Sequence, residues 1–405
     1  MSTIRFFHMA DLHLDSPFKG LFGLPEQHFK NIRESTFVAF DKIINKAVEE
    51  KPDFLLIVGD IYDGENRSLQ AQRRFQSAME TLFLHNIPVI LSYGNHDHLG
   101  GSWTRFALPS NVYELPAETS IVQLKIRGQL VNVYGFSYGE RHVKASMTDS
   151  FPVAQDPNAI HIGMLHGSES SDTAHAVYAP FKKEQLLEKN YHYWALGHIH
   201  KRQLIHQNPP IVYPGNIQSR HRKEQGVKGF YDVTLSQSEV ALTFVPTSAV
   251  VYNTIEIDCS DVVHANELLT KCEEALALNR QEYGASVVEL HLNNMDEQAE
   301  TLFEHASVAA WLETIREAEE QTEPMCWVQK LIVAKTTTKT YEPSIATESV
   351  VNLIENWGIQ EWKDILKDLY QHAGGARFIE PLTEQDIEHL KINTQALLVD
   401  EIQRV

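Results

Sequence analysis

Cysteine is scarce in this sequence of 405 residues, which has only Cys259, Cys272 and Cys326 and no Cys-x-x-Cys pair. Neither a disulfide framework nor a thiolate zinc site is therefore expected, and this usage is typical of a reducing cytoplasm. No uninterrupted apolar run approaches about 18 residues, so no membrane-spanning helix is expected. The N-terminus has carboxylates at Asp11 and Asp15 and no apolar core of the signal-peptide kind, which again predicts a cytoplasmic protein.

Basic residues are also in deficit: 35 Lys and Arg against 54 Asp and Glu give a formal net charge of −19. Taken alone, this value argues against a nucleic acid as partner, because phosphate binding favours a basic surface. The excess acid is confined to one part of the chain, since residues 1–250 have a net charge of −1 and residues 251–405 of −18. The first part, which also holds 15 of the 20 histidines, can still accept a phosphodiester, whereas the acidic part is better suited to face a protein.

The first part of the chain alternates strand-like and helix-like segments. Helical spacing of apolar residues predicts helices at 26–50 and 69–85. Apolar runs predict strands at 4–9, 54–58, 88–91, 121–126, 131–134, 160–165, 193–196, 211–213, 229–235 and 240–245. Helices between the early strands, and hairpins later, favour a layered α/β sandwich with mixed sheets.

A boundary is predicted at Pro246, after which the pattern becomes that of a small α+β unit. Its expected elements are strands at 250–257, 285–292 and 326–334 and helices at 261–278 and 297–320. The remainder is predicted to be helical, and its last apolar stripe comprises Ile387, Leu390, Leu397, Leu398 and Ile402. The predicted domains are thus 1–246, 247–340 and 341–405.

Five of the strand-like runs in the first part are followed by potential metal ligands. The polar groups are Asp11 and His13, Asp60 with Asp63, Asn95 to Asp97, His166, and His198 with His200. Because ligands bind at the carboxyl ends of strands in open α/β sheets, these side chains are expected to converge. Oxygen and imidazole ligands suit Mn²⁺, Fe²⁺ or Zn²⁺. Each motif alone is weak evidence, but five in order, each ending a predicted buried strand, are not expected by chance.

This set of motifs resembles that of the calcineurin-like metallophosphoesterase superfamily, over roughly residues 1–245. Three stretches, ADLHLDSPF (10–18), GDIYD (59–63) and YPGNIQSR (213–220), are similar to the SbcD-type DNA repair nucleases, and among them to YhaO-like bacterial exonucleases. The resemblance implies a four-layer αββα sandwich with a smaller C-terminal α+β cap and terminal helices. Residues 251–405 carry no chemical signature of their own.

Residue by residue, the resemblance implies two divalent metal ions, manganese in the first place, with iron or zinc as alternatives. The first ion would be held by Asp11, His13, Asp60 and His200. The second would be held by Asp60, as bridging carboxylate, with Asn95, His166 and His198. Two such ions about 3.5–4 Å apart clamp a phosphodiester and lower the pKa of a bridging water.

The residues after Asn95 are expected to assist the reaction. His96, on the opposite side of the chain from Asn95, is suited to protonate the leaving oxygen. Asp97 is expected to orient His96 or a ligand. For Asp63 a supporting role and a purely structural one are both open, and the basic cluster at 220–223 is either a phosphate contact or a solvated loop.

The function implied by the resemblance is a manganese-dependent 3′–5′ exonuclease that acts on DNA ends, with an SMC-like ATPase (SbcC- or YhaN-like) as partner and with a homodimer expected. The extra domain after Pro246 favours this reading. Phosphatases and small-molecule or cyclic-nucleotide phosphodiesterases share the same motifs and stay open as alternatives. A protein that chiefly regulates the ATPase is a third interpretation, in which the terminal apolar stripe docks on the partner.

Overall fold

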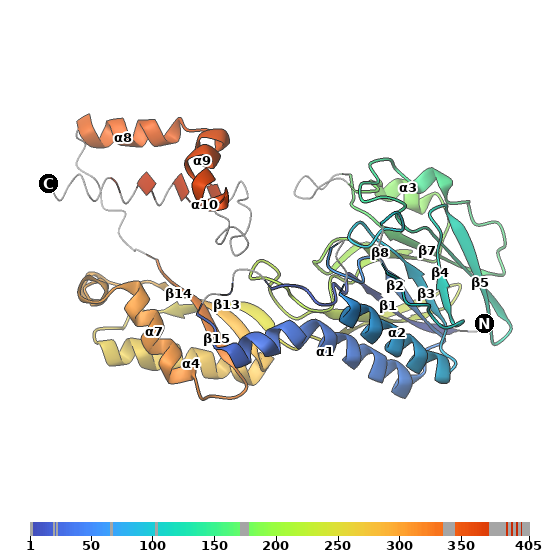
Figure 1. The fold of residues 1–405 in the computed structure, drawn as a ribbon, viewed down its shortest axis with the longest axis horizontal. Helices are drawn as coiled ribbons and strands as arrows, with labels where there is room; N and C mark the ends of the chain where they lie inside the picture. The colour runs from blue at the N-terminus through green and yellow to red at the C-terminus, as the bar shows by residue number, and fades with distance from the viewer. Residues whose placement is uncertain are drawn as a thin grey trace.

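The computed structural model describes most of the chain. The described residues are 3–18, 21, 23–64, 68–101, 104–170, 178–334, 345–371, 386, 387, 390, 391, 394, 395 and 398. Within them, two six-stranded sheets and one three-stranded sheet carry the fold (Figure 1).

The first sheet has the strand order β12-β11-β1-β2-β3-β4. Its strands are β1 (Ile4–Ala10), β2 (Phe54–Val58), β3 (Val89–Ser92), β4 (Val112–Glu114), β11 (Gly229–Leu235) and β12 (Val240–Pro246). Strands β1 to β4 run parallel, whereas β11 and β12 are antiparallel to their neighbours. Alternate residues of β1 are buried on opposite faces, Phe6 toward the second sheet and Phe7 toward the helices. Burial on both faces explains the continuous apolar runs of these strands.

Two helices cover the outer face of the first sheet, α1 (Glu26–Glu50) and α2 (Leu69–Leu84). Helix α1 is followed by its C-cap residue Lys51, whose backbone is left-handed (φ 49°). Pro52 comes next and cannot extend the helix. Helix α2 begins at Ser68, whose side chain accepts a hydrogen bond from the backbone N–H of Ala71, an N-cap that the sequence allows.

The second sheet has the strand order β5-β6-β7-β8-β10-β9. Its strands are β5 (Ser120–Ile126), β6 (Gln129–Gly135), β7 (Ile160–His166), β8 (Tyr193–Gly197), β9 (Gln203–Gln207) and β10 (Pro210–Tyr213). It packs on the first sheet through side chains such as Phe6, Phe54 and Tyr193. An aromatic cluster that includes Trp194 lies on its outer face, which the short elements η1 (Thr148–Ser150) and α3 (Lys183–Leu187) and loops cover. The predicted layered α/β sandwich is confirmed.

The third sheet consists of three parallel strands, β13 (Val251–Asp258), β14 (Ser286–Asn293) and β15 (Cys326–Val333). Helix α4 (Ala265–Tyr283) packs against it. The single helix expected at 297–320 is wrong, because the chain forms α5 (Glu297–Glu300), α6 (Leu302–His305) and α7 (Val308–Glu319). The side chains of Asp296 and Ser307 cap the N-termini of α5 and α7, and Ala306 has an extended backbone between α6 and α7. The apolar residues therefore keep a helical spacing across 297–320, although the helix itself is interrupted.

A small apolar cluster joins this sheet to the part of the chain that contains the two large sheets. Ile32 of α1 and Phe18 pack with Tyr252 of β13 and with Trp327 of β15, and Figure 1 shows α1 reaching toward the third sheet. Helices α8 (Ile345–Glu355), α9 (Ile359–Ile365) and α10 (Lys367–Gln371) follow.

Of the predicted terminal stripe, Ile387 packs with Ile354 and Trp362, whereas Leu397 and Ile402 lie outside the described residues. The domain boundaries at 246 and 340 stay predictions. None of the helices described is long and apolar enough to cross a membrane.

The core between the two large sheets predicts a clear stability difference. Leu56→Ala removes a fully buried side chain of β2 and is expected to lower the free energy of unfolding by about 2–5 kcal/mol, measured by urea unfolding. The matched control is Leu84→Ala in α2, where Leu84 is 77% exposed and the expected change is within about 0.5 kcal/mol. Equal unfolding midpoints for the two variants would contradict this packing.

Candidate metal centre

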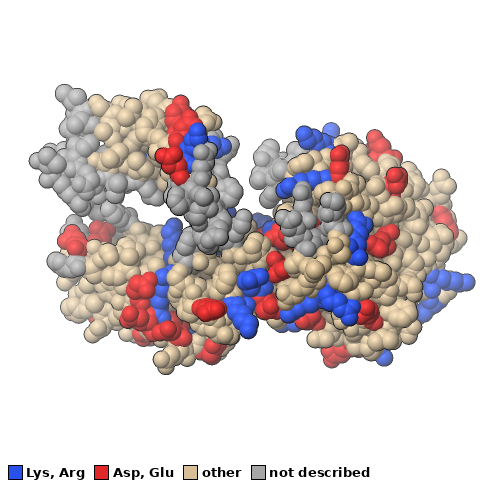
Figure 2. Space-filling view, viewed as in Figure 1, with Lys and Arg blue, Asp and Glu red and all other residues tan. Residues whose placement is uncertain are grey.

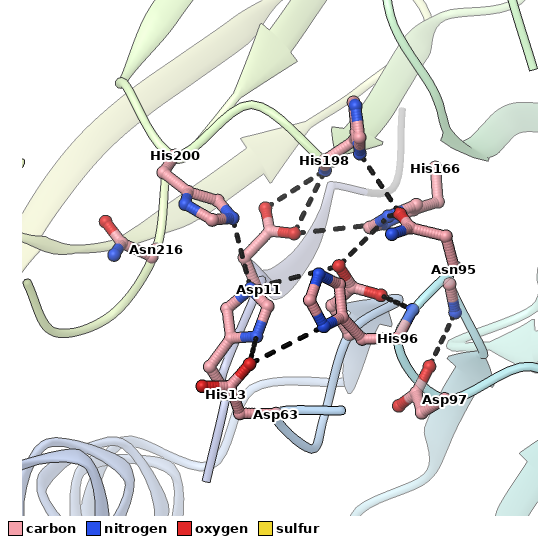
Figure 3. A network of polar contacts seen from close by, with 12 residues as sticks. Asp11, His13, Asp63, Asn95, His96, Asp97, His166, His198, His200 and Asn216 are labelled. Carbon is pink, nitrogen blue, oxygen red and sulfur yellow. Dashed lines mark hydrogen bonds and ion pairs between the residues drawn. The ribbon is translucent and has the colours of Figure 1, made fainter. Parts of the chain in front are cut away.

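The polar residues at the carboxyl ends of five strands meet in one cluster (Figure 3). Strands β1, β2 and β3 of the first sheet are parallel, as are β7 and β8 of the second, so within each sheet their carboxyl ends lie together. All seven ligands predicted from the sequence are brought into this one cluster: Asp11, His13, Asp60, Asn95, His166, His198 and His200.

One group of donors comprises Asp11, His13 and His200, with one ligand atom of each within 4.8 Å of the others. The Nε2 atoms of His13 and His200 face each other at 3.1 Å. Asp60 adjoins this group, since its Oδ2 lies 3.8 Å from Nε2 of His13. This is the donor set predicted for the first ion.

A second group comprises Asp60, His166 and His198, again within 4.8 Å of one another. The side-chain oxygen of Asn95 lies 3.1 Å from Nε2 of His166 and 3.2 Å from Nδ1 of His198. Oδ2 of Asp60 is 3.4 Å from Nε2 of His166. Asp60 therefore borders both groups, which is the position that a bridging carboxylate requires.

The donors fit two divalent cations. The facing Nε2 lone pairs of His13 and His200 repel each other, as do the buried carboxylates of Asp11 and Asp60. Protons or cations between these groups are needed to offset the repulsion. His166 faces the group with Nε2 while its Nδ1 lies 3.1 Å from the backbone oxygen of Val58. Such a contact fixes the tautomer of a metal-binding histidine. Oxygen and imidazole donors together suit Mn²⁺, Fe²⁺ or Zn²⁺.

Burial and mutual charge displace the pKa values of these groups. Burial, followed by the positive charge of Arg220, lowers the pKa of His13 to about 3 and that of His200 to about 4, which leaves both imidazoles neutral and able to bind a metal. Burial disfavours the charged form of His166, but Asp60 and Asp11 outweigh it and raise its pKa to about 9. A cation that enters therefore displaces a proton there, so metal affinity rises with pH.

Backbone strain is concentrated in the loops that carry the ligands. Asp11 (φ 52°), His13 (φ 42°), Asp60 (φ 49°) and His198 (φ 100°) all have left-handed backbones, which cost free energy in residues other than glycine. Hydrogen bonds hold the first two loops together, because the N–H of His13 donates to the oxygen of Asp60 at 3.0 Å. The fold thus maintains a strained arrangement at the position where the donors converge.

His96 lies at the rim of this cluster rather than inside it. Its side chain is 31% exposed, and its backbone N–H donates to Oδ1 of Asp60 at 2.9 Å. Nδ1 of His96 lies 3.5 Å from Oδ1 of Asp63, so Asp63 has a supporting contact that the sequence left open. A histidine beside the donors and open to solvent can reach a bound substrate.

Asp97 acts on the backbone of the ligand loops. Its carboxylate accepts hydrogen bonds from the N–H groups of Gly94 and Ile61, both at 2.7 Å. Gly94 and Ile61 are the chain neighbours of Asn95 and Asp60, so Asp97 positions these two predicted ligands through their backbone.

Sequence reasoning missed Glu224, whose Oε1 lies 2.7 Å from Nδ1 of His200. The basic cluster at 220–223 is not a solvated loop throughout: Arg220 is 3.4 Å from Asp63 and 3.3 Å from Glu224. Arg222 and Lys223 pair with Glu289 and Asp386. No sequence motif distinguishes Glu224 from the other glutamates of the chain. Its burial is seen only in the folded structure.

Comparisons with known proteins agree with this geometry. A family model described as calcineurin-like phosphoesterase matches residues 4–202, which include all seven predicted ligands. The metallophosphoesterase YhaO of Bacillus subtilis is 32% identical over 98% of this chain and 98% of its own. The DNA double-strand break repair protein Mre11 of Methanocaldococcus jannaschii is 27% identical over 65% of this chain and 69% of its own. Its namesake from Archaeoglobus fulgidus is 28% identical over 55% and 52%.

Gly94 offers a test of the second donor group. A Cβ at this position would lie 2.3 Å from Oδ1 of Asp60 and 2.7 Å from Nε2 of His166. Gly94→Ala is therefore expected to weaken Mn²⁺ binding at the second donor group by at least about tenfold, measured by isothermal titration calorimetry.

The control for this variant is Gly139→Ala, whose Cβ would meet Ala117 at an ordinary 3.4 Å and should leave both affinities unchanged. Two sites of wild-type affinity in Gly94→Ala would show that the second donor group does not hold an ion.

Proposed function

Because the chain belongs to the calcineurin-like phosphoesterase family and is a metal-dependent phosphoesterase, we propose that its substrate is DNA. The proposed activity is that of a manganese-dependent 3′–5′ exonuclease in DNA repair or end processing. The observation that carries the hydrolytic chemistry is the pair of buried donor groups that share Asp60, with His96 exposed beside them.

Support for DNA as substrate comes from the relatives. The two Mre11 proteins are described as DNA double-strand break repair proteins, and one of them matches 65% of this chain. The match to YhaO over 98% of the chain includes the parts beyond the sandwich, which a phosphatase acting on a small substrate does not require.

Different side chains of the site have different roles in hydrolysis. When bound, two divalent ions would polarise the phosphodiester and lower the pKa of a water. Asp11, Asp60 and Asn95 supply oxygen donors, and the neutral imidazoles of His13 and His200 supply nitrogen donors. His96 is placed to give a proton to the leaving oxygen, and Asp63, 3.5 Å from its Nδ1, can hold the ring in that orientation.

The charge pattern is compatible with a polyanion at this site. Figure 2 shows basic and acidic side chains interspersed over the described residues of the face in view, for the part that contains the two large sheets. Residues 1–250 have a net charge of −1, and the −18 of residues 251–405 lies beyond them. Bound cations would add positive charge where the phosphate must lie.

We further propose an SMC-like ATPase (SbcC- or YhaN-like) as partner, on the strength of the same resemblance. Leu398, a residue of the predicted terminal stripe, is exposed, which favours a protein contact in this region. Deletion of residues 381–405 is expected to abolish co-purification with the ATPase and to leave manganese-dependent hydrolysis intact. Co-purification that survives the deletion would place the contact elsewhere.

A substrate panel tests the activity. The protein with Mn²⁺ is offered linear duplex DNA labelled at its 5′ or 3′ end, the same DNA as a closed circle, a phosphoserine peptide and bis-p-nitrophenyl phosphate. We expect DNA to be shortened from its 3′ ends, with circular DNA untouched and activity lost on chelation. Hydrolysis of the small diester alone, with DNA intact at low salt, would favour a small-molecule phosphodiesterase, and release of phosphate from the peptide would favour a phosphatase.

The role of His96 is tested by His96→Ala. Loss of a general acid is expected to lower the rate of DNA cleavage by about 10²- to 10⁴-fold, while both Mn²⁺ affinities are retained. The internal control is bis-p-nitrophenyl phosphate, whose acidic leaving group needs little protonation and whose hydrolysis should fall much less. Cleavage of DNA at the wild-type rate would exclude this role for His96.

A further inference from the structure

Glu224 lies beyond the predicted ligands and is only 8% exposed. Its Oε1 is 2.7 Å from Nδ1 of His200. The opposite nitrogen of the same ring, Nε2, faces Nε2 of His13 at 3.1 Å and belongs with Asp11 to the first donor group. The imidazole of His200 therefore lies directly between Glu224 and the position of the first ion.

The Glu224 carboxylate is itself held in a fixed direction. Its Oε2 accepts hydrogen bonds from the amide of Asn216 at 2.8 Å and from the backbone N–H of Arg220 at 2.7 Å. Nη2 of Arg220 lies 3.3 Å from Oε1 and 3.1 Å from Nδ1 of His200, but Oε1 is the nearer partner of Nδ1 at 2.7 Å and, as a carboxylate oxygen, can only accept its hydrogen. Hydrogen bonds and a paired charge of this kind offset the cost of burying a carboxylate, and they leave Oε1 aimed at His200.

We propose that Glu224 is a positioning residue of the metal centre, which orients His200 by accepting the hydrogen of its Nδ1. The ring is then fixed in the tautomer that presents the lone pair of Nε2 to the first ion. This inference rests on the proposed metal centre and deepens it, because it assigns an outer partner to one ligand of one ion.

Arg220 extends the same arrangement to the other side of the first donor group. Its Nη1 lies 3.4 Å from Oδ1 of Asp63, and this oxygen lies 3.7 Å from Nδ1 of His13. Arg220 thus bridges the carboxylate behind His200 and the carboxylate behind His13. A buried cation between two carboxylates keeps both ionised and both in place.

The loop that carries Glu224 is tied to the third sheet. Arg222 is 3.2 Å from Glu289 of β14, and the N–H of Gly226 donates to the oxygen of Tyr252 in β13 at 2.8 Å. The position of Glu224 therefore depends on contacts outside the sandwich, although the ligand that it orients lies within it.

The test compares Glu224→Gln and Glu224→Ala with the wild type, in the metal-free full chain. Every group around Glu224 is a donor, so an amide must turn its NH₂ toward one of them. If it turns toward His200, it favours the tautomer with hydrogen on Nε2 and blocks the metal. The matched control is Glu319→Gln, which alters a carboxylate of α7 that is similarly buried and paired with Arg280 but is in the C-terminal part.

Mn²⁺ binding is measured by isothermal titration calorimetry, and the pairing of the two ions by electron paramagnetic resonance. In both Glu224 variants we expect one of the two affinities to fall by about 10- to 100-fold, with the other nearly unchanged and the spin-coupled manganese signal replaced by that of a single ion. Glu319→Gln should match the wild type. Thermal unfolding of the metal-free proteins shows whether each variant keeps the fold. Glu224→Gln keeps the size of the side chain, whereas Glu224→Ala truncates it.

Two affinities of wild-type strength in Glu224→Ala, which removes the acceptor altogether, would overturn the positioning role. Equal loss at both sites, or the same loss in Glu319→Gln, would also overturn it, because a general weakening of the fold then explains the result. Failure of the proposed function is distinct: a wild type that binds two ions but leaves DNA intact removes the nuclease and leaves this inference standing.

Discussion

The structure depends on keeping two carboxylates, Asp11 and Asp60, buried next to each other at the end of parallel strands. Both are almost inaccessible to solvent, and burying ionised carboxylates is costly unless they are paired or hydrogen-bonded. Burial raises the pKa of Asp11 to about 7; the negative charge of Asp60 adds to this effect, and the positive charge of His166 opposes it. The neighbouring histidines outweigh burial at Asp60 and hold its pKa well below the usual range. The backbone adds donors, since the N–H of His198 lies 3.0 Å from Oδ2 of Asp11. Such a site is stable only where cations or protons balance it, which is also the condition for metal-assisted hydrolysis.

The rigid parts of the fold supply the remaining requirement, which is a fixed distance between ligands from different sheets. The rings of Phe6 and Phe54, on neighbouring strands of the first sheet, stack at 5.0 Å, and Tyr193 of the second sheet packs edge-on against Phe6. This dense core holds the ends of β2 and β8 at a constant separation, so ligands from both sheets can share a small space. The left-handed residues of the loops are maintained by the same packing, because a looser core would let them relax.

Much of the sandwich and the convergence of the seven candidate ligands could be predicted from the sequence, since the relevant information is local. A buried strand is a continuous apolar run, and the candidate ligands follow within a few residues, as Asp11 and His13 follow β1. The short strands β4 and β9 were not predicted, because three residues of β4 and the half-exposed β9 carry no clear periodicity. The position of Glu224 could not be predicted either, since its contact with His200 joins residues 24 apart through a loop of irregular structure. Asp97, the residue after His96, was expected to orient His96 or a ligand; its carboxylate accepts hydrogen bonds from the backbone beside two candidate ligands, and the carboxylate beside the His96 ring is that of Asp63.

Net charge illustrates the same distinction between sequence and space. The value of −19 averages a nearly neutral catalytic part and an acidic C-terminal part that have different surroundings. The acidic part is nevertheless not separate from the chemistry, because Glu289 of its sheet holds Arg222, two residues from Glu224. The third sheet therefore contributes to the position of the loop that carries Glu224. The contacts from Glu289 to Arg222 and from Glu224 to His200 thus connect the acidic C-terminal part, which has no chemical motif, to the histidine-rich part that has one.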